Sequence, residues 1–123
     1  VHALEYPVGG VTHCSHGAGN GLLLPFVMRY NLPARRHQFA LLARLLGAEM
    51  DGKNEAEAAD AAITAVEQLR ADIGIPLRLR DLGVVESQLR PFAEKAFDIK
   101  RILRVNPRPV TVEDLEGILR AAF

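Results

Sequence analysis

Hydrophobic residues recur at helical spacing along most of the chain. From residue 39 onward, four stretches repeat apolar residues at intervals of three and four, which places them on one face of an α-helix. The four stripes are Phe39, Leu42, Ala43 and Leu46; Ala59, Ala62, Ile63, Val66, Leu69 and Ile73; Leu89, Phe92, Ala93, Ala96 and Leu103; and Leu115, Ile118, Leu119 and Ala122. No segment alternates apolar and polar residues for long enough to predict a strand. The pattern predicts an all-α fold, a helical bundle of about five or six helices.

Local signals mark where several of these helices begin and end. Asn54 and Glu57 stand three residues apart, as do Thr111 and Asp114. Each pair has the residue types of a capping box, in which each side chain accepts a hydrogen bond from the other residue's backbone N–H. Glycine after the last apolar position is typical of a helix end. We therefore expect helices to begin after Asn54 and Thr111, and one to end near Gly47.

One predicted helix differs from the others. The stretch GAGNGLLLPFVMRY, residues 17–30, is apolar on nearly every side, and its first charge is Arg29. A helix that is hydrophobic all round is a buried one. Each glycine weakens it by about 1 kcal/mol relative to alanine, so Gly17 and Gly19 are expected where another group approaches the backbone. Pro25 removes one intrahelical hydrogen bond and is expected to kink the helix.

Composition narrows the class of protein. Hydrophobic residues make up 49% and charged residues 24% of the 123, typical of one soluble globular domain. Fifteen basic residues balance fifteen acidic ones, so nothing predicts binding to nucleic acid or to an anionic membrane. No apolar run approaches the roughly 20 residues that a membrane span needs. The single cysteine, Cys14, rules out an intramolecular disulfide, and we expect a cytoplasmic location.

The candidate chemistry lies at the start of the chain, where three of the four histidines occur within the first sixteen residues. A helical segment ending near Pro7, a turn at residues 8–10 and a helix beginning near Gly17 predict a helical hairpin, which could bring His2 and His16 together. Neutral imidazole is a common ligand of zinc and iron. The spacing matches no compact ligand motif, however, and two ligands cannot complete a tetrahedral site. Spacing alone leaves open whether the two are ligands or ordinary polar residues at helix ends.

Longer motifs carry a resemblance to a known family. HALEYPVGG at 2–10, HGAGNGLLLP at 16–25 and VMRYN at 27–31 resemble the H-x-x-x-H-P-x-G…H-G-x-x-N-A-x-x-L-P signature of the iron-containing (group III) alcohol dehydrogenases. The resemblance continues through ADIGIP, LRDLGV, NPR and TVEDL, and so covers the whole chain in order. It implies that residues 1–123 are the C-terminal helical domain, of dehydroquinate synthase-like fold, of a longer chain whose N-terminal α/β cofactor domain is absent.

By this resemblance, His2 and His16 occupy two of the four metal-ligand positions of the family. The other two, an Asp and a His four residues after it, precede this region in relatives. The implied activity is hydride transfer between NAD or NADP and an alcohol or aldehyde, assisted by Fe2+ or alternatively Zn2+. The chain alone would be inactive, would require its own N-terminal domain as partner, and by default would belong to a homo-oligomer. No residue of this chain is assigned to the nicotinamide cofactor.

The sequence departs from the family signature at one position, where Tyr6 replaces the second histidine of H-x-x-x-H. In relatives that position is assigned a proton-relay role. A tyrosine, with an ordinary pKa near 10, is a poorer relay at neutral pH than a histidine with an ordinary pKa near 6.5. Two interpretations stay open for Tyr6: a catalytic role in the active site, or packing at a domain junction.

The other polar residues of this segment carry weaker expectations. His13 and His37 are expected to be exposed, and Cys14 to be a small buried residue. Asn20 either orients a ligand or ties down a turn. Two further functions remain alternatives to the alcohol dehydrogenase: a non-catalytic helical interaction module, and a polyol or hydroxy-acid dehydrogenase of the same superfamily.

Overall fold

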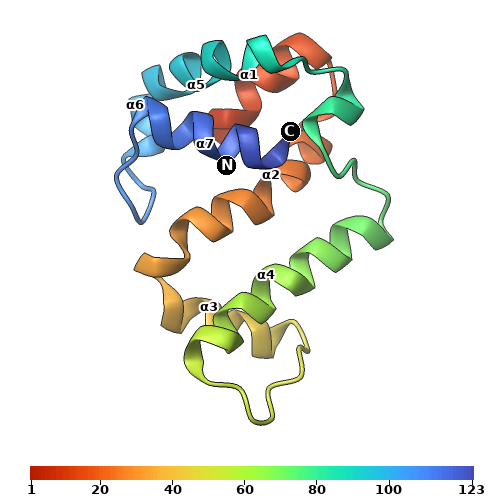
Figure 1. Cartoon of the computed structure of the whole chain (residues 1–123), viewed down its shortest axis with the longest axis vertical. Coiled ribbons are helices and arrows are strands. Elements are labelled where there is room, and N and C mark those ends of the chain that lie inside the picture. The colour runs from red at the N-terminus through yellow and green to blue at the C-terminus, as the bar shows by residue number, and fades with distance from the viewer.

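The computed structural model describes all 123 residues and contains only helices (Figure 1). The α-helices are α1 His2–Thr12, α2 His16–Asn31, α3 Arg36–Leu45, α4 Glu55–Asp72, α5 Leu89–Asp98, α6 Lys100–Leu103 and α7 Val112–Ala122. Short 3-10 helices lie at Leu32–Ala34, Leu79–Leu82 and Glu86–Gln88. The all-α class is confirmed, with seven α-helices where about five or six were expected. The extra helix arises because Ile99, with φ −83° and ψ 57°, separates α6 from α5.

The helices form two groups joined by α2. Helices α1, α5, α6 and α7 gather in one half of the molecule, α3 and α4 lie in the other, and α2 runs between them (Figure 1). The larger core cluster holds sixteen buried side chains from α1, α2, α5 and α7 and from the segment before α5. The smaller cluster consists of Met28, Ala43, Ala62 and Ile63. Because α2 contributes to both clusters, it is the element that holds the two halves together.

The expected burial of α2 is confirmed for much of the helix, although Leu24 is 37% exposed. Leu22, Leu23 and Pro25 have fully buried side chains, and α2 contacts α1, α4 and α7. Its C-terminal end is also tied to the loop that precedes α7. There the Tyr30 hydroxyl donates a hydrogen bond to the carbonyl oxygen of Pro109 over 2.6 Å. No helix in the molecule combines the length and the apolar character needed to cross a lipid bilayer.

The expected hairpin turn at residues 8–10 is wrong, because α1 continues through Pro7 and both following glycines to Thr12. The chain turns instead at residues 13–15. His13 ends the helix in the left-handed conformation, with φ 55°, and its N–H bonds the carbonyl of Gly9. Pro7 costs the helix one hydrogen bond and sits in its interior, buried against the core. The helix tolerates this loss because its apolar face is fully engaged.

Both predicted capping boxes are present, at Asn54 with Glu57 and at Thr111 with Asp114. The apolar stripe of α7 is buried as expected. The stripe of α4 is buried only in part, since Leu69 and Ile73 are 52% and 64% exposed. Leu69 instead lines an open groove beside the loop that joins α3 to α4.

Candidate functional site

The two histidines at the starts of α1 and α2 lie side by side. The ring centroids of His2 and His16 are 5.2 Å apart, and the ring planes differ by 11°. His2, Glu5, Tyr6 and Gly9 follow one another at intervals of three, one and three residues, which places them on a single face of α1. This face receives the first turn of α2, and so the fold brings together residues that are fourteen positions apart.

A buried carboxylate stands behind this pair. Glu5 Oε2 lies 2.6 Å from His16 Nδ1, and the Glu5 side chain is only 4% exposed whereas that of His16 is 56% exposed. This is the only hydrogen bond that the Glu5 side chain makes within the chain. Sequence reasoning missed Glu5. The signal was present, since Glu5 falls among Ala3, Leu4 and Val8 on the buried side of α1.

Two glycines on facing helices leave the space that Glu5 occupies. A Cβ at Gly9 would lie 2.5 Å from Glu5 Oε1, and a Cβ at Gly19 would lie 2.9 Å from Glu5 Cγ. Gly19 is therefore a close-approach position as expected, although the group that approaches it is a carboxylate side chain. A Cβ at Gly17 would meet nothing within 4 Å, so no group of this chain approaches its backbone, and the expectation that a metal ligand or the cofactor does so stays a prediction.

Tyr6 adds a third ring to the same surface. Its ring centroid lies 5.9 Å from that of His16 with an interplanar angle of 21°, and the residue is 47% exposed. The Tyr6 hydroxyl makes no hydrogen bond within the chain. His2, Tyr6 and His16 thus form an exposed cluster of three rings, called here the ring cluster.

Asn20 borders the ring cluster and ties down the turn beneath it. Its Nδ2 donates a hydrogen bond of 2.9 Å to the backbone carbonyl of His16, one helical turn earlier. The same nitrogen lies 3.3 Å from Nδ1 and 3.2 Å from Nε2 of the His16 ring. Both roles considered for Asn20, orienting the ring and closing the turn, are compatible with these contacts.

The remaining candidates lie apart from the rings. His13 is exposed at the end of α1, as expected, and Cys14 is half-buried rather than fully buried. His37 is exposed on α3, with Nδ1 3.4 Å from Glu55 Oε2. No group of three or more His, Cys, Asp or Glu side chains in the chain is arranged to hold a metal ion.

The chemistry of the two neighbouring imidazoles nevertheless suits a metal ion. Two imidazoles on one tetrahedral ion, with metal–nitrogen bonds of about 2.0–2.1 Å, have ring centres about 5 Å apart. The His2 and His16 centroids have this separation. Metal-binding histidines usually donate the other ring N–H to a carboxylate or carbonyl, and Glu5 offers such a carboxylate to His16. The described chain therefore supplies two imidazole donors and a carboxylate behind one of them.

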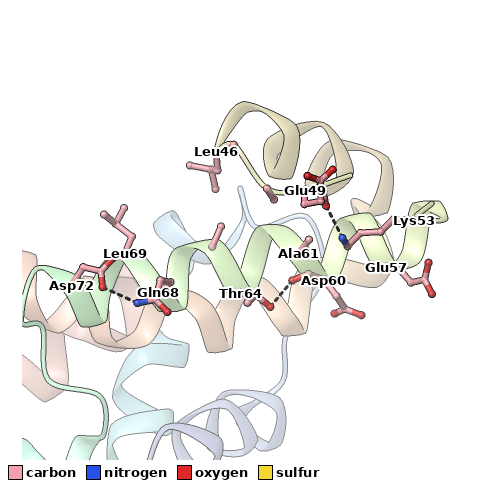
Figure 2. A pocket seen from close by; sticks show the side chains of 13 residues that line it. Leu46, Glu49, Lys53, Glu57, Asp60, Ala61, Thr64, Gln68, Leu69 and Asp72 are labelled. Carbon is pink, nitrogen blue, oxygen red and sulfur yellow. Dashed lines mark hydrogen bonds between the residues drawn. The ribbon is translucent and has the colours of Figure 1, made fainter. Parts of the chain in front are cut away.

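An open groove of about 720 Å³ lies on the other half of the molecule, along α4 and the loop before it (Figure 2). All but one of its charged side chains are acidic: they are Glu49, Glu57, Asp60 and Asp72, with Lys53. Several of these groups bond within the groove wall, as Figure 2 shows for Gln68 and Asp72 and for Lys53 and the Glu49 carbonyl. None of the three rings lines it, so the groove and the ring cluster are separate features.

Comparisons with known proteins extend over the whole chain. The chain is 42% identical over 123 residues to the 1,3-propanediol dehydrogenase of Citrobacter freundii, covering 100% of this chain and 32% of that protein. It is 37% identical, with the same coverage, to the NAD-dependent methanol dehydrogenase of Bacillus methanolicus. The crystal structure of a 1,3-propanediol oxidoreductase superposes with a TM-score of 0.94 at 41% identity, covering 99% of this chain and 32% of that one.

The chain thus spans about a third of the length of the curated relatives that it matches. The family described as "Fe-containing alcohol dehydrogenase family, C-terminal" matches residues 1–123. Since that match covers the full length, and the helical fold agrees with it, this chain belongs to the Fe-containing alcohol dehydrogenase family.

Proposed function

We propose that residues 1–123 act as the C-terminal helical domain of a longer, metal-dependent alcohol dehydrogenase, with an α/β cofactor domain preceding them. The proposed reaction is hydride transfer between NAD or NADP and an alcohol or aldehyde. Two observations support this reaction class: the family match over the whole chain, and relatives that are named as dehydrogenases of alcohols. The printed name of the methanol dehydrogenase supports NAD as the first cofactor to test.

His2 and His16 are proposed as two ligands of the catalytic metal. The observation that carries this proposal is the 5.2 Å separation of the two exposed rings, reached across the junction of two helices. A bound Fe2+ or Zn2+ would supply Lewis-acid assistance at the oxygen of the alcohol or aldehyde. The two remaining ligands are proposed to come from the preceding domain, which places the site in the cleft between the domains.

Tyr6 is proposed to border the substrate. Its ring lies beside His16, and its hydroxyl is unengaged within the chain and so free to exchange a proton with a substrate or with solvent. The alternative is that Tyr6 packs against the preceding domain. The variant Tyr6→Phe separates the two, because it keeps the ring and removes the proton. A changed pH profile of kcat indicates proton transfer, whereas an unchanged profile indicates packing.

The ligand proposal is tested by His2→Ala and His16→Ala in the full-length protein, with His37→Ala as the matched control. Each ligand variant is expected to lose bound metal and to reduce kcat/KM by at least about 100-fold, since a catalytic metal supplies several kcal/mol of transition-state stabilisation. The control variant is expected to keep its bound metal and its kcat/KM. Full activity in the two ligand variants, with only a modest loss of stability, would favour a non-catalytic interaction module instead.

The 123-residue chain by itself is expected to bind Fe2+ only weakly and to catalyse nothing, because two imidazoles do not complete a metal site. Anaerobic titration measures this. A nanomolar dissociation constant for Fe2+ on the isolated chain would contradict the proposed division of ligands between two domains.

Short diols are the substrates to assay first, since the 42% identical relative is named as a 1,3-propanediol dehydrogenase. If the full-length protein prefers a polyol or a hydroxy acid, the proposed metal ligands remain the same and only the proposed substrate class changes. A homo-oligomer is proposed as the working assembly, and sedimentation of the full-length protein measures it.

A further inference from the structure

We propose that Glu5 is a positioning residue that holds the proton of the His16 ring on Nδ1, which leaves Nε2 as the nitrogen with a free lone pair. The use of this free lone pair for metal binding rests on the proposed function, because an imidazole binds a metal through an unprotonated nitrogen. The placement of the proton itself rests only on contacts within this chain.

The first support is the hydrogen bond. A carboxylate oxygen only accepts, so the 2.6 Å contact between Glu5 Oε2 and His16 Nδ1 requires a proton on Nδ1. Bonds of this length between a ring N–H and a carboxylate belong to the strong, charge-assisted class. Asn20 does not compete for this choice, because its Nδ2 is nearly equidistant from the two ring nitrogens and donates to a backbone carbonyl.

The second support is burial. The Glu5 side chain is 4% exposed and His16 is its only hydrogen-bonding partner. Burying a carboxylate is unfavourable unless the charge is paired or hydrogen-bonded. A carboxylate kept in this position therefore indicates a role that an apolar residue of the same size would not perform.

The third support is the space made for the carboxylate. Gly9 and Gly19, on facing helices, are the positions where a Cβ would collide with Glu5. By contrast, a Cβ at Gly10 or Gly17 would meet nothing within 4 Å. A Cβ at Gly21 would be equally close to another group, 2.5 Å from Ile75 Cδ1, so what distinguishes Gly9 and Gly19 is that both lie against Glu5. The Glu5 carboxylate that they flank reaches the Nδ1 side of His16.

The chain contains its own control for the effect of a neighbouring carboxylate. His37 Nδ1 lies 3.4 Å from Glu55 Oε2, but these two side chains are 79% and 55% exposed. Water competes for both groups there, so the pair is not expected to fix the tautomer of His37. Glu5→Gln and Glu55→Gln are therefore matched variants, since each removes one carboxylate beside one histidine.

The first experiment measures the ring tautomers by long-range 1H–15N NMR on the metal-free 123-residue chain at about pH 8, above the ordinary histidine pKa near 6.5. His16 is expected to be predominantly in the Nδ1–H form, and Glu5→Gln is expected to give a mixture, because a glutamine amide can donate or accept. Glu55→Gln is expected to leave both histidines unchanged. A backbone spectrum of each variant checks that the fold is retained. A predominant Nε2–H form of His16 in the parent chain, or no change in Glu5→Gln, would overturn the proposal.

The second experiment measures Zn2+ affinity of the full-length protein by chelator competition. Loss of an outer partner of a metal ligand is expected to weaken binding about 10- to 100-fold, so Glu5→Gln should fall in that range. An affinity within about twofold of the parent would overturn the link between Glu5 and metal binding, because it lies far below that range. The variant His16→Ala separates the two proposals. If its Zn2+ affinity equals that of the parent, the proposed ligand role of His16 fails. The NMR experiment still decides which ring nitrogen of His16 carries the proton.

Discussion

Asn31, at the end of α2, and Asn106, in the loop before α7, exchange two amide hydrogen bonds of 2.9 Å each. Asn106 also donates to the backbone carbonyl of Arg108 over 2.7 Å. Asn31 is buried, and the two residues are 75 positions apart in the sequence. The pair therefore joins the central helix to the last loop of the fold, and it accounts structurally for two of the motifs that carried the family resemblance.

Replacing one member of this pair should be costly. Asn31→Ala removes both hydrogen bonds between the two amides and leaves Asn106 Oδ1 without its donor in a partly buried site, so the free energy of unfolding is expected to fall by about 1–3 kcal/mol. Denaturant unfolding of Asn31→Ala, Asn106→Ala and the double variant measures this as a double-mutant cycle. Strictly additive losses would show that the two amides do not interact.

Two glycines in the first turn of α2 should respond in opposite directions to the same substitution. Gly19→Ala places a Cβ against Glu5 and Cys14, and overpacking of this kind is expected to destabilise the fold by about 1–3 kcal/mol. Gly17→Ala enters open space and removes backbone freedom from the unfolded chain, so it is expected to be neutral or to stabilise by up to about 1 kcal/mol. Thermal unfolding of both variants is the measurement, and equal effects at the two positions would contradict the crowding around Glu5.

The cap of α7 should make stability depend on acidic pH. A hydrogen bond from the backbone N–H of Thr111 holds the pKa of Asp114 below its ordinary value. Because the folded-state pKa is depressed, the stabilisation is complete above the unfolded-state pKa of about 3.9 and is lost as the pH falls through the folded-state pKa. The difference in Tm between the parent and Asp114→Asn is therefore expected to be constant near neutral pH and to shrink in acid. Asp51→Asn, in an exposed loop, is the control variant for the loss of one carboxylate.

Ion pairs on the surface of α5 and α7 are expected to contribute less to stability than the partly buried amide pair of Asn31 and Asn106. Arg90 lies 2.9 Å from Glu94, 3.1 Å from Glu113 and 3.2 Å from Glu116, and all but the last of these groups are well exposed. Exposed ion pairs contribute little and are screened by salt. Arg90→Gln is expected to lower stability less than Asn31→Ala does, and the loss should shrink further in concentrated salt. A loss that is larger than that of Asn31→Ala and insensitive to salt would contradict this.

Much of the fold was predictable from local patterns. The capping boxes at Asn54 and Thr111 and the buried face of α7 depend on residues within one or two helical turns, whose spacing is visible along the chain. The hydrophobic character of α2 predicted its central place for the same reason. The pairing of His2 with His16 was also expected, although its proposed role as a metal site came from the family resemblance rather than from spacing.

What only the tertiary structure decided lies between residues distant in sequence. The turn between α1 and α2 begins at residue 13 rather than at residue 8, since α1 continues through Pro7 and its two glycines with Val8 fully buried between them. Leu69 is 52% exposed and lines an open groove although it lies on the apolar stripe of α4, and periodicity does not encode this. Helical spacing determines which side chains share a face, whereas the partner of each face is set by long-range packing. For that reason the sequence shows Glu5 only as a charged residue on the buried side of α1. The tertiary structure supplies its partner, because the first turn of α2 places His16 against it.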